Sequence, residues 1–344
     1  MMLRALRRRI AAGLWALAVP ALALAQAPSV APAPAAAAQR ADCPPLPQPL
    51  DPAAIPQALR AARDHGLLWR VEQGGRTSWL YGTVHAAKRD WMLPGPTVLA
   101  AVRASDRVAL ELDLLDPAVA RALQTAMRAP AGMPPLPPAL ARRLAAQREA
   151  ACADPSLAEL RPELQVASLA VMAARRDGID PAYGIDLVLS GLARGLGKPV
   201  VSLESVELQV GVLASNDPQE TAAAVATGLE QLEGPTARDT LTTLATAWAD
   251  GRAQLLESYG QWCDCMRTPE ERKAFEQLVV DRNPGLARSI AAEHRAGHSV
   301  FAAVGALHMV GPRGLPALLA REGFRVERVQ WPAQAAAAAG TPAR

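Results

Sequence analysis

The sequence lacks the features that mark nucleic-acid-binding and integral membrane proteins. After residue 25 it has no apolar segment approaching the ~20 residues that a membrane-spanning helix needs. Aromatic residues make up only 4% of the chain and none are interleaved with a basic cluster, so no nucleic acid is expected as a partner. No phosphate-binding loop, dinucleotide-binding glycine motif or G-x-S-x-G motif is present, which disfavours nucleotide chemistry and a serine nucleophile.

The first 25 residues have the composition of a cleavable secretory signal peptide. Four arginines precede a short apolar run, and residues 23–25 (ALA) provide the small-x-small pattern ahead of Gln26. An uncleaved anchor is the alternative, but the run is too short to span a bilayer and Pro20 interrupts it. The sequence therefore predicts a periplasmic protein that is exported by the general secretory route.

Cleavage of this segment would change the charge of the protein. The full chain carries +3 and the segment contains four arginines and no acid, so the remainder carries 3 − 4 = −1. Residues 26–50 are rich in alanine and proline and predict a disordered tether. Residues 332–344 predict a disordered tail, and no stable membrane insertion is expected after cleavage. The oligomeric state stays open.

The four cysteines predict up to two disulfides in an oxidising compartment. Cys263 and Cys265 lie so close in the chain that we expect no unstrained bridge between them. Each is expected to pair with one of the distant cysteines, Cys43 and Cys152, with either combination open. A thiolate metal site at this pair is the less favoured alternative.

Short apolar strands that alternate with helices predict an α/β fold. Residues 67–85 form two β-rich runs around Gly74-Gly75, typical of a hairpin. Further strands are expected at 107–113, 199–203, 299–304 and 324–329, and a helical insertion at about 115–180. A GTVH segment near the start and a GALH segment near the end repeat one pattern. We therefore expect a central mixed sheet of two related halves with flanking helices, in a single domain over 51–331.

Two of the five histidines follow predicted strands in the same way. His85 closes the GTVH segment and His308 closes the GALH segment, each three residues after a glycine that would let the chain turn. Ligands collect at the carboxyl ends of strands in open α/β sheets. Glu111 lies in the apolar run RVALELD, where a buried carboxylate is costly unless a cation is near. His85, Glu111 and His308 are thus predicted to hold one metal ion with an open position for water.

Other polar residues are weaker candidates. Glu204 ends the strand VVSLE, Asp186 lies on a helix among apolar residues, and Arg282 precedes a helix break. We expect Glu204 to transfer protons, Asp186 to orient a ligand and Arg282 to stabilise negative charge. His294 and His298 are spaced like helical metal ligands, but without an HExxH motif a solvated helix end is the favoured interpretation.

Four segments, taken in order, resemble the TraB/GumN family, which includes the animal TIKI proteins. They are GTVH with ELDL, YGIDLVLSGLARGLGKPVVSLESVELQ, LVVDRNPGLARSI and VFAAVGALHMVGPRGLPALLAREGFRVERV. The resemblance spans residues 67–329 and implies a fold related to the erythromycin-esterase and ChaN-like group. It also implies a metal-dependent hydrolase, with His85, Glu111 and His308 at the positions of the paired GxxH motifs and the acid.

The expected function is accordingly a periplasmic metal-dependent hydrolase, in particular a peptidase that acts on a peptide or protein by metal-activated water. The TIKI branch favours manganese or cobalt, whereas ligand type alone favours zinc. The alternative is a non-catalytic envelope protein that sequesters a peptide or assists polysaccharide export.

Overall fold

Six strands form one mixed sheet in the computed structural model, which describes residues 42–331. In chain order they are β1 (Leu67–Gln73), β2 (Arg76–Thr83), β3 (Arg107–Leu110), β4 (Val200–Ser202), β5 (Val300–Gly305) and β6 (Arg325–Val329). Their order across the sheet is β4-β3-β5-β2-β1-β6, and the first four are parallel neighbours. β1 runs antiparallel to both β2 and β6. The predicted signal peptide, residues 26–41 of the predicted tether and the predicted tail lie outside the described residues.

The predicted hairpin is confirmed as β1 and β2. Gln73 pairs with Arg76, which leaves Gly74 and Gly75 as the two turn residues. Both have positive φ, 59° and 74°, as the tight hairpin turn that matches strand twist requires. β1, β2 and β5 are largely buried, so the hairpin belongs to the core of the sheet.

Fourteen α-helices cover the sheet and extend beyond it within residues 42–331. They are α1 (Ile55–Ala61), α2 (Pro96–Ala104), α3 (Pro117–Met127), α4 (Pro138–Ala150), α5 (Pro162–Met172), α6 (Ile185–Gly195), α7 (Val206–Leu213), α8 (Pro218–Glu233), α9 (Thr236–Ala249), α10 (Ala253–Glu257), α11 (Tyr259–Trp262), α12 (Pro269–Phe275), α13 (Asn283–Arg295) and α14 (Leu315–Arg321). Aspartates cap two of these helices, Asp116 for α3 and Asp217 for α8, each ahead of a proline in the first turn. No helix in this part of the chain is long and apolar enough to cross a membrane.

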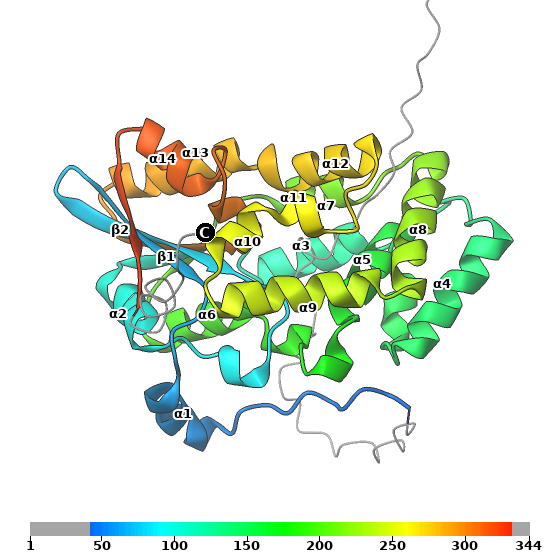
Figure 1. The fold of residues 1–344 in the computed structure, drawn as a ribbon, viewed down its shortest axis with the longest axis horizontal. Helices are drawn as coiled ribbons and strands as arrows, with labels where there is room; N and C mark the ends of the chain where they lie inside the picture. Colours follow the sequence, from blue (N-terminus) through cyan, green and yellow to red (C-terminus); the bar gives the residue numbers. More distant parts are fainter. Residues whose placement is uncertain (1–41, 332–344) are drawn as a thin grey trace, which may run out of the picture.

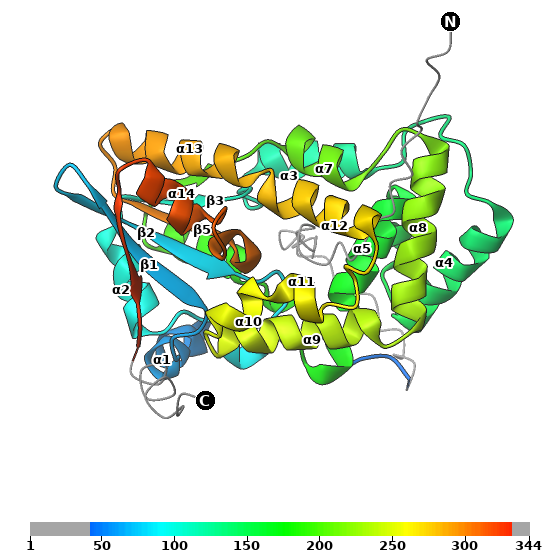
Figure 2. The ribbon, with the colours of Figure 1, turned by 45° about the horizontal axis from the view of Figure 1, so that its top comes forward.

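The two faces of the sheet carry different helices (Figure 1). The crossovers through α2 and α6 run towards β4, whereas those through α13 and α14 run towards β6. Because crossovers between parallel strands are right-handed, opposite directions place the helices on opposite faces. Figure 2 shows this arrangement, with α13 and α14 on one side and α2 on the other. The mixed α/β architecture with flanking helices is therefore as predicted, whereas the relation between two halves stays a prediction.

A helical region lies beyond the end of the sheet, towards α4 and α8 (Figure 1). The chain between β3 and β4 forms α3 to α6, where the sequence predicted a helical insertion. α4, α5 and α8 share a small core of their own, made of Leu144, Val166, Leu169, Val225 and Leu229. This region supplies one wall of the cavity described below.

The described part of the predicted tether, residues 42–50, forms neither helix nor strand and is held against the domain. Cys43 is bonded to Cys152 across a sequence separation of 109, with 5.7 Å between their Cα atoms. The Gln48 amide donates a hydrogen bond of 2.7 Å to the hydroxyl of Tyr183. A disulfide is therefore present, as expected, but it joins the two cysteines that were expected to pair with Cys263 and Cys265.

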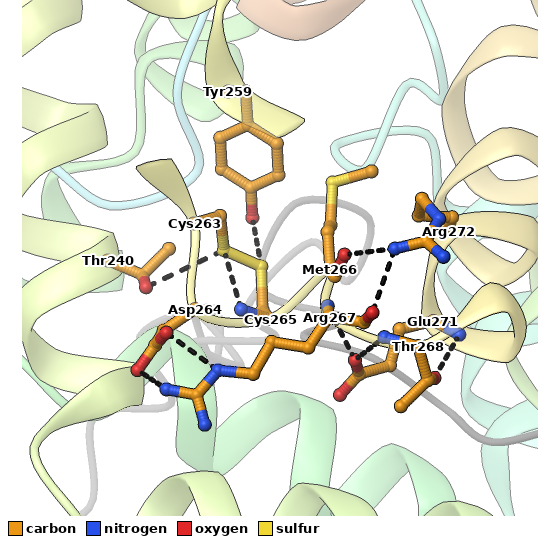
Figure 3. Close-up of a disulfide and its surroundings, with 10 residues drawn as sticks. All are labelled: Thr240, Tyr259, Cys263, Asp264, Cys265, Met266, Arg267, Thr268, Glu271 and Arg272. Atoms are coloured by element: carbon orange, nitrogen blue, oxygen red, sulfur yellow. Dashed lines mark hydrogen bonds and ion pairs between the residues drawn. A yellow bond between two sulfur atoms is a disulfide. The ribbon is translucent and has the colours of Figure 1, made fainter. Parts of the chain in front are cut away.

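The expected pairing of Cys263 and Cys265 with distant cysteines is wrong. They are bonded to each other, with Cα atoms 5.0 Å apart, which lies within the usual range for disulfides (Figure 3). Cys263 directly follows α11 in an extended conformation, and both cysteine side chains are buried. The Tyr259 hydroxyl contacts the Cys265 Sγ at 3.2 Å, and no free cysteine remains in the described residues.

Candidate functional site

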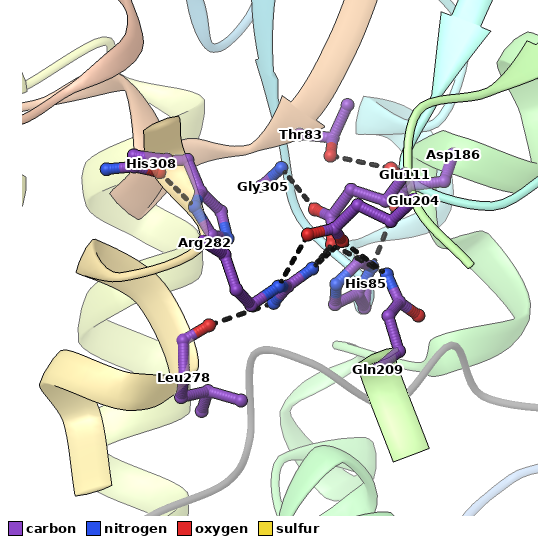
Figure 4. A network of polar contacts seen from close by, with 11 residues as sticks. Thr83, His85, Glu111, Asp186, Glu204, Gln209, Leu278, Arg282, Gly305 and His308 are labelled. Carbon is purple, nitrogen blue, oxygen red and sulfur yellow. Dashed lines mark hydrogen bonds and ion pairs between the residues drawn. The ribbon is translucent and has the colours of Figure 1, made fainter. Parts of the chain in front are cut away.

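The carboxyl ends of the four parallel strands bring the predicted site residues to one edge of the sheet. His85 follows β2, Glu111 follows β3 and Glu204 follows β4. His308 follows β5 in a short 3-10 turn, Ala306–Met309. Since β4, β3, β5 and β2 are neighbours in that order, the chain places these side chains together (Figure 4). The structure thus places His85, Glu111 and His308 at one edge of the sheet, whereas their role as ligands of one metal ion stays a prediction.

The glycines of the two repeated segments serve close packing rather than an unusual backbone conformation. Neither Gly82 nor Gly305 has a positive φ, so the expected role in turning the chain is wrong. A Cβ at Gly305 would lie 3.3 Å from the Glu111 Oε1 and 3.4 Å from the His308 ring. The Gly305 amide instead donates a hydrogen bond of 2.8 Å to that oxygen. Glycine therefore lets β5 approach the site closely.

Arg282 links the two glutamates in a buried cluster. Its Nη2 donates to the Glu111 Oε2 at 2.6 Å, and its Nε donates to the Glu204 Oε1 at 3.0 Å. The same Nη2 also contacts the Glu204 Oε2, and Nη1 donates to the Leu278 carbonyl oxygen at 2.9 Å. Arg282 and Glu111 are 5% and 6% exposed. Two carboxylates share one guanidinium, so the cluster retains one excess negative charge.

Gln209 is a further member of this cluster, for which the sequence predicted no role. It lies on α7 and is buried, and its Nε2 donates to Glu111 at 3.1 Å and to Glu204 at 3.2 Å. Its Oε1 is buried without a hydrogen-bond partner among the described residues. The only signal in the sequence was a polar residue on a short apolar helix, VELQVGVL, which is weak on its own.

Each imidazole is held at Nδ1 by the side chain of a neighbouring residue. The His85 Nδ1 lies 2.8 Å from the Asp186 Oδ2, and Thr83 donates to the other oxygen of Asp186 at 2.7 Å. The His308 Nδ1 lies 2.6 Å from the Asn283 Oδ1. Since both partners are acceptors, each Nδ1 carries the proton and each Nε2 is the basic nitrogen. Metal-binding histidines are commonly held in this way.

The amide of Asn283 can face His308 in only one orientation. Its Nδ2 donates to the Arg313 carbonyl oxygen at 2.8 Å, which leaves Oδ1 for the imidazole. Asn283 begins α13 and directly follows Arg282, after a π-helical turn at Glu276–Val280. The sequence predicted a role for Arg282 but none for Asn283, and the structure adds the asparagine as the partner of His308.

Burial and charge shift the pKa values of the cluster in definite directions. Burial is the largest single effect and would raise the pKa of Glu111. The charge of Arg282, the nearby imidazoles and the Gly305 amide together outweigh burial and lower the pKa to about 2. Burial and then the charge of Arg282 lower the pKa of His308 to about 3. Burial alone would lower the pKa of Arg282, but Glu111 and Glu204 together raise the pKa above its ordinary value. At neutral pH Glu111 is ionised and His308 is neutral.

The alternative pair on α13 has another role. The two ring nitrogens of His294 lie 2.8 Å from the Ser78 Oγ and 3.0 Å from the Gln73 carbonyl oxygen, and the side chain is buried. The expected solvated helix end is therefore wrong for His294, because it attaches α13 to the β1–β2 hairpin. With both nitrogens engaged, His294 has none for a metal ion.

The residues at the sheet edge partly fit a metal ion. Two imidazoles with anchored Nδ1 atoms and an ionised carboxylate are a suitable set of donor types. Within residues 42–331, however, no three His, Cys, Asp or Glu side chains are already arranged around a common ion position. Arg282 contacts the Glu111 Oε2, so an ion would compete with this guanidinium for the carboxylate.

A cavity of about 660 Å³ adjoins the cluster on the side of the helical region. Glu204 and Arg282 line it, together with residues of α7, α8, α12 and α13. Cavities of this size accommodate small organic ligands or a few amino-acid residues. The two residues expected to move protons and stabilise charge thus face a space that a substrate can occupy.

The fold and the site define an α/β protein with a polar centre where parallel strands end, adjacent to a ligand-sized cavity. The model of the TraB/PrgY/gumN family matches residues 67–328, which is more than half of the chain, so the chain belongs to this family. It is also similar to "Uncharacterized protein YbaP" of Shigella flexneri, with 27% identity over 259 residues. That similarity covers 72% of this chain and 89% of YbaP. No solved structure matches the chain.

Proposed function

We propose that the protein is a periplasmic metal-dependent hydrolase that acts on peptides or proteins. The observation that carries this proposal is the pair of imidazoles with anchored Nδ1 atoms beside a buried cluster of two carboxylates and one guanidinium. His85, Glu111 and His308 would hold a divalent ion, either zinc, as ligand type favours, or manganese or cobalt. When bound, such an ion supplies a Lewis acid that brings the pKa of water towards neutrality.

Charge and protonation state support the choice of ligands. The two glutamates exceed Arg282 by one negative charge, which favours binding of a cation. His308 is neutral at neutral pH because burial and Arg282 lower its pKa, and the neutral imidazole is the form that binds metals. Glu111 would exchange its contact with Arg282 for the ion, so Arg282 would then remain with Glu204.

The other residues of the cluster have roles that suit hydrolysis of an amide. Glu204 lines the cavity, so its carboxylate can take a proton from water there and return it to the leaving amine. Arg282 lines the same cavity and can donate hydrogen bonds to the negative charge that develops on the carbonyl oxygen. Asp186 keeps the His85 ring in the tautomer whose Nε2 is basic.

A periplasmic location agrees with two features of the chain. Its amino-terminal segment has the composition of a secretory signal, and the four cysteines form two disulfides, which persist in oxidising compartments.

Metal content and peptide hydrolysis test the proposal together. Protein isolated from the periplasm without chelator should contain about one divalent ion per chain and cleave members of a peptide library. A chelator should abolish cleavage, Mn²⁺, Co²⁺ or Zn²⁺ should restore it, and Glu204→Gln should bind the ion without cleaving. Protein that contains no metal and cleaves nothing would instead support the non-catalytic function in peptide sequestration or polysaccharide export.

A further inference from the structure

The cavity beside the cluster has apolar walls and a charged interior. Leu203, Val212, Leu213, Ala224 and Ala274 are among the apolar residues that line it. At the end nearest the sheet, Glu204 and Arg282 pair with each other, and on another wall Asp281 pairs with Arg313. Glu204 and Asp281 therefore each have a guanidinium partner, although the cluster of Glu111, Glu204 and Arg282 keeps one excess negative charge. Arg288 also lines the cavity and forms no ion pair among the described residues.

Glu163, in the first turn of α5, is a different kind of wall residue. It is only 3% exposed, and its Oε1 accepts hydrogen bonds from the Ser215 amide at 3.1 Å and the Thr221 hydroxyl at 2.6 Å. Its Oε2 is buried without a hydrogen-bond partner among residues 42–331, where Glu163 also forms no ion pair. A buried carboxylate oxygen without a donor is costly.

A second carboxylate lies beside it. The hydroxyl of Ser215 donates to the Glu220 Oε2, so one serine contacts both Glu163 and Glu220, and both glutamates line the cavity. Arg161 reaches the same loop, but its guanidinium bonds to the Ser215 carbonyl oxygen and to Asn216 rather than to either carboxylate. The cavity therefore holds two neighbouring carboxylates that lack a cationic partner in the described structure.

We propose that Glu163 and Glu220 form a subsite for an ammonium or guanidinium group on an apolar stem. The cation would supply the donor that the Glu163 Oε2 lacks, and the stem would lie against the leucine and valine side chains. The identity of the ligand rests on the proposed function. If the protein hydrolyses peptides, the cationic group is a Lys or Arg side chain of the substrate. The binding site itself depends on neither metal nor catalysis.

Calorimetric titration of the metal-free protein with hexylamine and with 1-hexanol tests the subsite without turnover. The two probes share a stem and differ in charge, so hexylamine should bind at least about tenfold more tightly. Glu163→Gln should remove most of this preference. Asp281→Asn is the matched control, since it neutralises a cavity carboxylate that already has a partner, and it should retain the preference.

Two further probes distinguish recognition of a side-chain ammonium from recognition of a free α-amino group. Nα-acetyl-lysine amide carries only the side-chain ammonium, and alanine amide carries only the α-amino group. The lysine derivative should displace hexylamine and alanine amide should not. Equal binding of hexylamine and hexanol by the wild-type protein would overturn the proposal, even if Glu163→Gln failed to fold. So would an undiminished preference in folded Glu163→Gln, which would make Glu163 only a support for the loop at Ser215. Because no hydrolysis is measured, these outcomes are distinct from failure of the proposed function.

Discussion

At the scale of single residues, each polar group of the site is defined by its neighbours. A histidine at a strand end has many possible roles. The acceptors at the Nδ1 atoms of His85 and His308 favour a role in which Nε2 is the basic nitrogen, as in metal-binding histidines. A glutamate after an apolar strand indicates a nearby cation, and the cation that the structure supplies is Arg282. The expectation of a cation beside the buried Glu111 carboxylate is thus correct, and in the described structure this cation is Arg282.

The lowered pKa of His308 predicts how the stability of the metal-free protein depends on pH. Unfolded chains protonate this imidazole near its ordinary pKa of 6.5, whereas the folded protein resists protonation down to about 3. The unfolded state therefore binds more protons between these values, and stability falls as pH falls through this window. Glu111 acts with the same sign at lower pH, between its ordinary pKa of 4.5 and about 2.

Urea unfolding at pH 7 and pH 5, in the presence of a chelator, measures the contribution of His308. Replacing His308 with Gln should reduce the loss of unfolding free energy between these two pH values by about 2 kcal/mol. His298→Gln changes a partly exposed imidazole. The loss of unfolding free energy between pH 7 and pH 5 should therefore stay close to that of the wild-type protein. An equal loss in His308→Gln and wild type would show that His308 does not resist protonation.

At the scale of elements, the sequence predicted the positions of the strands better than it predicted the side-chain contacts at their ends. The two β-rich runs in residues 67–85 and the two glycines between them predicted the hairpin. The apolar runs predicted β3 to β6 within a few residues. The parallel order then placed His85, Glu111 and His308 at one edge. Contacts across many elements, such as Gln209 with both glutamates, leave no local pattern, so they could not be predicted.

The bridge between Cys263 and Cys265 was missed for a related reason. Spacing in the sequence suggested two side chains held apart, but a local bend and the packing of Tyr259 bring the sulfurs together. Burial of His294 likewise depends on the hairpin, which lies more than 200 residues earlier in the chain.

The attachment of α13 to the hairpin gives a prediction at this scale. His294→Ala removes the contacts with Ser78 and Gln73 and leaves buried polar groups unsatisfied, which should lower the free energy of unfolding by about 1–3 kcal/mol. Because the ring takes no part in the sheet-edge site, metal binding should be retained. His298→Ala, on the same segment, should change stability by less than about 0.5 kcal/mol in chemical denaturation. Loss of metal from a folded His294→Ala protein would contradict this assignment.

At the scale of the whole molecule, the two disulfides should contribute very differently to stability. The Cys43–Cys152 bond closes a loop with a sequence separation of 109, whereas the other bond spans a separation of 2. A cross-link restricts the unfolded chain more when the loop is longer. Cys43→Ala/Cys152→Ala should therefore lose about 2–5 kcal/mol, and Cys263→Ala/Cys265→Ala should lose less, as measured by thermal and urea unfolding. The reverse order would contradict this reasoning.

The whole molecule also explains why the outer residues of the site can be more than 190 positions apart. The sheet brings strands from both ends of the chain together, with β2 next to β5. The segments between them supply Asp186, Glu204, Gln209 and Arg282, and α7, α8 and α13 contribute to the walls of the cavity. The site is thus a property of the complete domain and is not expected in isolated segments.

The most direct test of the central claim is the metal content of single variants of the protein. His85→Ala, Glu111→Gln and His308→Ala should each lose the bound ion while keeping the circular dichroism of the wild type, because these side chains follow strand ends rather than fill the core. Wild type and His298→Ala should each retain about one ion per chain. If the three variants kept the ion, or if His298→Ala lost it, His85, Glu111 and His308 would not form the metal site.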